Sequence, residues 1–155
     1  MPDILEIAIR ALPHGPEFRF LDRLTSLVPG QKGVGEYHVR GDEYYLRGHL
    51  PGEPILPGVL LVEAGAQLAG VVAQEDPLHP TPLRLKLTAL RAVKILGTAR
   101  PGETVRLEAS ITGRLGPLLQ ARIIASVSGV HVMTAELTLT DTGAQSSRSA
   151  RSSPP

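Results

Sequence analysis

The chain has 155 residues, and its 16 basic and 15 acidic side chains leave a formal net charge of +1. This near neutrality gives no electrostatic footprint for nucleic acid, and an aromatic content of 3% without tryptophan offers no platform for stacked bases. The absence of cysteine excludes disulfides, thiolate metal sites and a cysteine nucleophile. The length and the hydrophobic content of 42% are typical of a single globular domain.

The N-terminal third predicts a short helix followed by two strands. Apolar residues at helical spacing indicate a helix over residues 3–12, with Asp3 as the N-cap. Downstream, a strand is expected to end at the turn Pro29–Gly30, and residues 34–39 indicate the next strand.

A long apolar segment then predicts a central helix from Pro57–Gly58 to about Gln74, because proline is favoured in a first helical turn. Small or apolar residues lie on all its sides, which is typical of a helix enclosed by protein. Glu63 and Gln67 are four residues apart and share one face, so that face should point at something polar. A membrane span is disfavoured because it would place a carboxylate within the bilayer.

The second half of the chain predicts an antiparallel sheet. After a loop at residues 75–82 the apolar residues alternate with a period of two, and glycine- or proline-containing turns separate the runs. We expect these runs to form a meander, curved around the central helix and burying it, in an α+β fold. The runs cover residues 83–90, 103–113, 118–128 and 130–140.

The two ends of the sequence set the expected domain and location. Residues 141–155 contain no Leu, Ile, Val or aromatic residue, so we expect a disordered tail after a single domain at residues 1–140. The opening sequence MPDILEIAIR lacks the basic segment and apolar core of a secretory signal, so we expect a cytoplasmic protein.

The loop before the central helix carries the candidate chemistry. Residues 49–58, HLPGEPILPG, hold three prolines, and such a stiff loop can fix the imidazole of His49 for acid–base work. Gly58 opens the helix with free amide donors at the positive end of the dipole, which suits a carbonyl that gains charge. Glu63 lies among apolar residues, where an unpaired carboxylate is costly, so we interpret it as the partner of His49.

This region closely resembles the signature of the (3R)-hydroxyacyl-[acyl carrier protein] dehydratases of type II fatty acid synthesis. The segment HLPGEPILPGVLLVEAGAQLAG carries it, and Leu12-Pro13-His14 and Asp22-Arg23 upstream are in register with the same family. Leu50 stands where the family has an aromatic residue. The matching positions are His49, Pro51, Gly52, Pro54, Pro57, Gly58, Val59, Glu63, Ala64, Ala66 and Gln67.

The resemblance implies a hot-dog fold and a homodimer with shared active sites, possibly assembled as a hexamer from three dimers. His49 of one subunit would face Glu63 of the other. The implied enzyme is a hydro-lyase that converts a (3R)-3-hydroxyacyl thioester into the trans-2-enoyl thioester. His49 would act on the C2 proton, Glu63 would assist loss of the hydroxyl, and the Gly58 amide would polarise the thioester carbonyl. Gln67 and Val59 would support the site.

The resemblance also implies that no metal or redox cofactor is needed, since the substrate is carried on the phosphopantetheine arm of acyl carrier protein. Basic residues are candidates for docking this acidic carrier, with a solvated strand face as the alternative. His14 is interpreted as a loop residue near the interface rather than as a catalyst. The docking candidates are Arg84, Lys86, Lys94 and Arg100.

Two other functions remain open from the sequence. One is a related hydratase or thioesterase that uses coenzyme A thioesters. The other is a hot-dog protein that binds acyl thioesters or a partner without catalysis, although such a binder gains nothing from a buried carboxylate.

Overall fold

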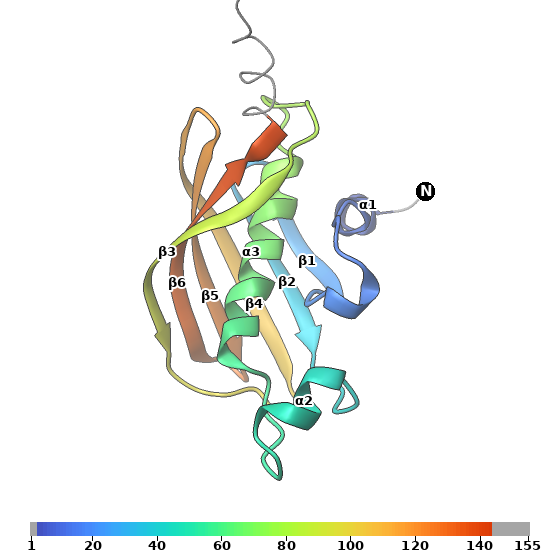
Figure 1. Ribbon diagram of the computed structural model, residues 1–155. Coiled ribbons are helices and arrows are strands. Elements are labelled where there is room, and N and C mark those ends of the chain that lie inside the picture. The colour runs from blue at the N-terminus through green and yellow to red at the C-terminus, as the bar shows by residue number, and fades with distance from the viewer. Residues whose placement is uncertain (1–2, 144–155) are drawn as a thin grey trace, which may run out of the picture.

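The computed structural model describes residues 3–143, and its central element is one long helix, α3, that lies along a curved sheet (Figure 1). Residues 144–155, which hold most of the expected C-terminal tail, lie outside the described residues. In chain order the elements are α1 (Ile4–Arg10), the 3-10 turn η1 (Pro16–Phe18), β1 (Arg23–Val28), β2 (Lys32–His38), α2 (Tyr44–His49), α3 (Gly58–Gln74), β3 (Leu85–Ile95), β4 (Thr104–Leu115), β5 (Leu118–Val127) and β6 (Val130–Asp141).

The helix boundaries follow from local signals. The Asp3 side chain accepts a hydrogen bond from the Leu5 amide and caps α1, as predicted. Helix α3 begins directly after Pro57 and ends at Gln74, so its predicted bounds are confirmed. Helix α2 was not predicted, and it carries His49 as its last residue.

The sheet is antiparallel throughout, in the order β1-β2-β4-β5-β6-β3. The predicted meander is confirmed for β4, β5 and β6, but β3 does not lie beside β4. It pairs instead with β6, from Leu85 opposite Asp141 to Ile95 opposite Met133. The simple meander is therefore wrong for this strand, because the chain crosses from one edge of the sheet back to its middle after β3 (Figure 1).

Alternate residues of the central strands pack on α3. Strand β4 buries Val105, Leu107 and Ala109 on one face, and the residues between them are exposed or only partly buried, which is the pattern of a half-buried strand. The helix approaches the sheet closely, because a Cβ atom at Gly65 would overlap the Ile123 side chain of β5. The sheet thus curves around an enclosed helix, and the predicted α+β hot-dog architecture is confirmed.

Strand β3 forms one edge of the sheet, and every residue after its first is exposed. An edge strand of this length with apolar side chains is a surface that proteins normally cover. Its exposed large apolar residues are Leu87, Leu90, Val93 and Ile95.

Within residues 3–143, no helix combines the length and the hydropathy required to cross a membrane.

Candidate active site

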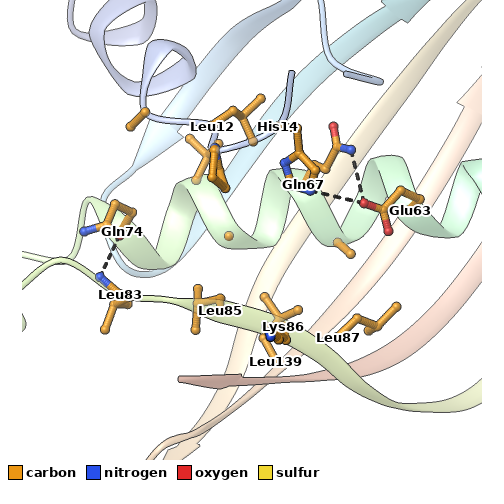
Figure 2. Close-up of a pocket in the computed structure, with 15 residues that line it drawn as sticks. Leu12, His14, Glu63, Gln67, Gln74, Leu83, Leu85, Lys86, Leu87 and Leu139 are labelled. Atoms are coloured by element: carbon orange, nitrogen blue, oxygen red, sulfur yellow. Dashed lines mark hydrogen bonds and ion pairs between the residues drawn. The ribbon is translucent and has the colours of Figure 1, made fainter. Parts of the chain in front are cut away.

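Glu63 lies in the second turn of α3. Its side chain is 24% exposed, whereas Val62 and Ala64 on either side are buried. One carboxylate oxygen, Oε1, accepts a hydrogen bond from Gln67 Nε2 at 3.2 Å and lies 3.4 Å from His14 Nε2 (Figure 2). The structure therefore brings together the predicted pair Glu63 and Gln67, with His14 as a third member.

Gln67 ties this carboxylate to the N-terminal segment. Its side chain is buried, with a relative exposure of 2%. Its Oε1 accepts from the Phe20 amide at 3.0 Å, while its Nε2 donates to the Phe18 carbonyl at 2.9 Å as well as to Glu63. A buried amide with all these bonds is rigid, so the segment that carries His14 is held in register with α3.

A cavity of about 290 Å³ extends along this face of α3. Glu63 and Gln67 lie at one end, and Gln74 lies at the other, where its Oε1 accepts from the Leu83 amide at 3.0 Å (Figure 2). The wall between these ends is mostly apolar, so the cavity suits an aliphatic chain whose reactive end meets the carboxylate. The lining residues between the two ends include Leu12, Ala66, Gly70, Val71, Leu85, Leu87 and Leu139.

His49 lies elsewhere in the same chain. It is exposed at the end of α2, and its Nδ1 is 3.4 Å from the Ile55 carbonyl. It is not among the residues that line the cavity beside Glu63. Within one chain the structure thus does not bring the two predicted catalytic residues together.

Gly58 and Val59 form the first turn of α3. No side chain caps this end of the helix, and the Leu60 amide donates to the Pro57 carbonyl at 2.9 Å. The role of the Gly58 amide stays a prediction. A Cβ atom at Gly58 would lie 3.1 Å from Ile95 of β3, which leaves little room for a side chain. Val59 is 74% exposed, which is unusual for an apolar residue so close to a candidate site.

A partly buried carboxylate, that of Glu43, holds the turn that precedes α2. Glu43 accepts hydrogen bonds from the Arg40 and Gly41 amides, both at 2.7 Å, and from the Tyr37 hydroxyl at 3.0 Å. Burial acts to raise the pKa of Glu43, but these hydrogen bonds outweigh it and lower the pKa. Burial likewise raises the pKa of the Tyr37 phenol, so Tyr37 remains a donor. This network anchors the start of the helix that positions His49.

The four basic candidates for carrier docking are spread out. Arg84 precedes β3, where its amide donates to Asp141 Oδ1, and Lys86 lines the cavity. Lys94 lies eight residues further along β3, roughly 25 Å away at about 3.3 Å per residue. Arg100 belongs to the following loop. The structure does not gather them into one patch.

The position of His14 beside Glu63 was not predicted from the sequence. The available signal was its place in the Leu12-Pro13-His14 motif, which matched the family's upstream register. Leu12, Pro13 and His14 all line the cavity. Spacing alone could not reveal this, because the contact joins a loop to a helix far along the chain. For metal ions, residues 3–143 contain no group of three or more His, Cys, Asp or Glu side chains arranged to bind one.

A curved antiparallel sheet around one enclosed helix, with a carboxylate at the end of an apolar cavity beside that helix, defines a hot-dog protein with a pocket for an acyl-type ligand. Comparison with known sequences makes the class more specific. The model of the FabA-like domain matches residues 12–136. The chain belongs to this family, among its 3-hydroxyacyl-[acyl carrier protein] dehydratases of the FabZ type.

Three bacterial relatives illustrate the match, and each is a 3-hydroxyacyl-[acyl-carrier-protein] dehydratase FabZ. The Ligilactobacillus salivarius protein is 35% identical over 138 residues, covering 89% of this chain and 97% of that protein. The Chloroflexus aggregans protein is 36% identical over 126 residues, covering 81% and 87%. The Myxococcus xanthus protein is 31% identical over 153 residues, covering 97% and 99%.

Solved structures share the fold at low sequence identity. The dehydratase heterocomplex ApeI:P from Xenorhabdus doucetiae matches with a TM-score of 0.74 and 18% identity, covering 90% of this chain and 92% of that one. A hypothetical thioesterase with coenzyme A from Streptococcus pneumoniae matches with a TM-score of 0.59 and 13% identity, covering 77% and 86%. These likenesses support the hot-dog fold.

Proposed function

We propose that this protein dehydrates (3R)-3-hydroxyacyl-[acyl carrier protein] to trans-2-enoyl-[acyl carrier protein] in type II fatty acid synthesis. The observation that carries the proposal is the Glu63 carboxylate at the polar end of an apolar cavity along α3. Membership of the FabA-like family and the names of the FabZ relatives support the same reaction.

The reaction is an elimination of water and needs acid–base groups rather than a redox partner. In our proposal His49 takes the proton from C2, the C2–C3 double bond forms, and the C3–O bond breaks. Glu63 gives its proton to the departing hydroxyl, which leaves as water. The amide of Gly58 at the start of α3 polarises the thioester carbonyl while negative charge develops there. The substrate remains on the phosphopantetheine arm, and no separate cofactor takes part.

A homodimer would complete the site. His49 lies outside the Glu63 cavity of its own chain, so a second chain is the natural source of the histidine. The exposed apolar edge strand β3 and the exposed Val59 are surfaces that such a partner would cover. Assembly of three dimers into a hexamer remains a prediction from the resemblance, and the cytoplasmic location remains a prediction from the N-terminal sequence.

Docking of acyl carrier protein is proposed for the cavity end of β3. Lys86 lines the cavity and Arg84 is two residues away, so these two cations are the nearer candidates for an acidic carrier. Lys94 and Arg100 would contact the carrier only if its surface extends along the whole strand.

The first experiment follows the hydration of crotonyl-acyl carrier protein by loss of the enoyl-thioester absorbance. Wild type, His49→Ala and Glu63→Gln are compared, with His131→Ala and Glu6→Gln as controls, because both control residues are exposed and outside the cavity. We expect His49→Ala and Glu63→Gln to lose roughly 100-fold or more in rate. The two control variants should match the wild type.

Other outcomes identify the rival functions. Release of free thiol would indicate a thioesterase, and turnover of crotonyl-coenzyme A without turnover of the carrier substrate would indicate a coenzyme A hydratase. Binding of enoyl thioesters of all chain lengths without turnover would indicate a non-catalytic binder. Full activity of Glu63→Gln would overturn the proposed role of the carboxylate.

A further inference from the structure

The two oxygens of the Glu63 carboxylate have different surroundings. Gln67 Nε2 and His14 Nε2 both meet Oε1, at 3.2 and 3.4 Å. For Oε2, the described part of the chain supplies no hydrogen-bond donor. Figure 2 shows both dashed contacts converging on one oxygen, while the second oxygen points away from His14 and Gln67. One oxygen is therefore held by the protein, and the other is left for a ligand.

The surroundings of the His14 ring decide which nitrogen carries the proton. Its Nδ1 is buried and has no hydrogen-bond partner. A hydrogen on Nδ1 would be buried without an acceptor and would turn the lone pair of Nε2 towards the Glu63 carboxylate, whereas a hydrogen on Nε2 faces that acceptor, so a hydrogen on Nδ1 is disfavoured. The neutral ring then carries its hydrogen on Nε2, which is the nitrogen that faces Glu63.

Contacts with Phe18 and Arg19 also hold the His14 ring and its backbone in place. It stacks on Phe18, with ring centroids 6.3 Å apart and an interplanar angle of 30°. The backbone carbonyl of His14 accepts a hydrogen bond from Arg19 Nε at 2.8 Å. Because Gln67 binds the Phe18 carbonyl, the same segment that supports the ring is fixed to α3. These contacts hold His14 Nε2 at 3.4 Å from Glu63 Oε1 and restrict rotation of the side chain.

We propose that His14 is a positioning residue that, together with Gln67, holds Glu63 Oε1 and so assigns the reactive proton to Oε2. The inference rests on the proposed dehydratase function. When Oε2 gives its proton to the departing hydroxyl, the O–H bond of Glu63 breaks, a bond to the leaving oxygen forms, and Glu63 becomes a carboxylate. The hydrogen bond from Gln67 and the contact with His14 Nε2 both strengthen as this charge develops, because a carboxylate attracts an N–H group more strongly than a carboxylic acid does. The benefit therefore appears in the chemical step, not in substrate binding.

The test uses two amide variants that differ in reach. In His14→Gln the side-chain amide can take the place of Nε2 and donate to Glu63. In His14→Asn the amide corresponds to the buried Nδ1 and stops short of the carboxylate. We expect His14→Asn to lose about 10-fold to 100-fold in kcat, as for a lost hydrogen bond to a charged group, with KM unchanged. His14→Gln should recover most of this loss in kcat.

Equal kcat values for the Asn and Gln variants, or a change confined to KM, would overturn the positioning role. A second measurement does not depend on turnover. In the wild-type protein with ¹⁵N-labelled histidine, the His14 ring should show the neutral tautomer with hydrogen on Nε2. A hydrogen on Nδ1 would overturn the assignment even if the enzyme is active. Conversely, absence of wild-type turnover with the expected tautomer would count against the proposed function and not against the geometry.

Discussion

At the scale of single residues, the spacing of Glu63 and Gln67 made their contact predictable, because residues four apart on a helix are neighbours. The structure has this contact at 3.2 Å. The contact of His14 with Glu63 was not predictable in this way. It depends on how a proline-containing loop folds back over α3, and the two residues lie 49 positions apart in the chain. Local sequence patterns predict helices and strands, but they do not predict which loop packs over a given helix.

Glu43 offers a prediction about pH. Its pKa is lowered in the folded protein, mainly by backbone hydrogen bonds from Arg40 and Gly41 that overcome the effect of burial. A carboxyl with a depressed folded pKa stabilises the fold above its unfolded pKa, and this contribution is lost as the pH falls through the folded value. The free energy of unfolding should therefore decrease as the pH falls below 4.5, the ordinary pKa of a glutamate side chain.

The measurement is urea unfolding at about pH 7 and about pH 3, with wild type and Glu43→Gln compared. The stability of Glu43→Gln should fall less between the two conditions than that of the wild type. Asp76, whose pKa is lowered by the Leu78 amide and by His79, is present in both proteins, so its contribution cancels. An identical loss of stability in both proteins would mean that Glu43 does not carry this dependence.

At the scale of elements, α3 was predictable because Pro57 fixes its start and its apolar surface persists on every side. Helix α2 was not, since its six residues include two tyrosines and a glycine, which are weak helix formers. Its stability comes from the tertiary network of Glu43 and Tyr37, which a local pattern does not contain.

The face of α3 that lines the cavity makes a prediction about acyl chain length. Gly70 lies seven residues beyond Glu63, roughly 10 Å along the axis at about 1.5 Å per residue. A Cβ atom at Gly70 would meet no atom within 4 Å, so a larger side chain could enter the cavity without a clash. Gly70→Leu should therefore block longer acyl chains and spare short ones.

The measurement compares hydration of a four-carbon and a ten-carbon enoyl-acyl carrier protein by each variant. In Gly70→Leu the ratio of long-chain to short-chain kcat/KM should fall about tenfold or more, with Gly70→Ala in between. Gly48→Leu is the matched control, because Gly48 is also helical, has open space around its Cβ position and does not line the cavity. An unchanged ratio in Gly70→Leu would place the acyl chain elsewhere.

At the scale of the whole molecule, the six-stranded sheet and its wrapped helix were predictable from the alternating runs, but the position of β3 was not. Tight turns specify which neighbouring strands pair, and they gave β4, β5 and β6 correctly. The pairing of β3 with β6 spans two intervening strands, and no turn encodes it.

The proposed dimer predicts that two inactive variants can complement each other, which a site within a single chain would not allow. If His49 and Glu63 meet across two subunits, a heterodimer of His49→Ala and Glu63→Gln contains one site with both native residues. Co-refolding equal amounts of the two inactive variants should therefore restore about a quarter of the wild-type activity, since half of the dimers would each have one working site. The assay is hydration of crotonyl-acyl carrier protein before and after mixing.

Two controls define this result. Refolding each variant alone should give no recovery. Mixing either variant with the His49→Ala, Glu63→Gln double variant should also give none, because no native pair can form. If the mixture of single variants remains inactive although heterodimers are detected, the two residues do not act across the subunits.

The sheet order has a consequence for the newly made chain. Strand β3 emerges from the ribosome before β4, β5 and β6, yet its hydrogen-bonding partner is β6. At about 5–20 residues per second, β3 waits for several seconds with its backbone and apolar side chains unpaired. During this interval it is open to pairing with other nascent chains or to capture by a chaperone. The order of synthesis thus makes β3 the most vulnerable strand before folding is complete.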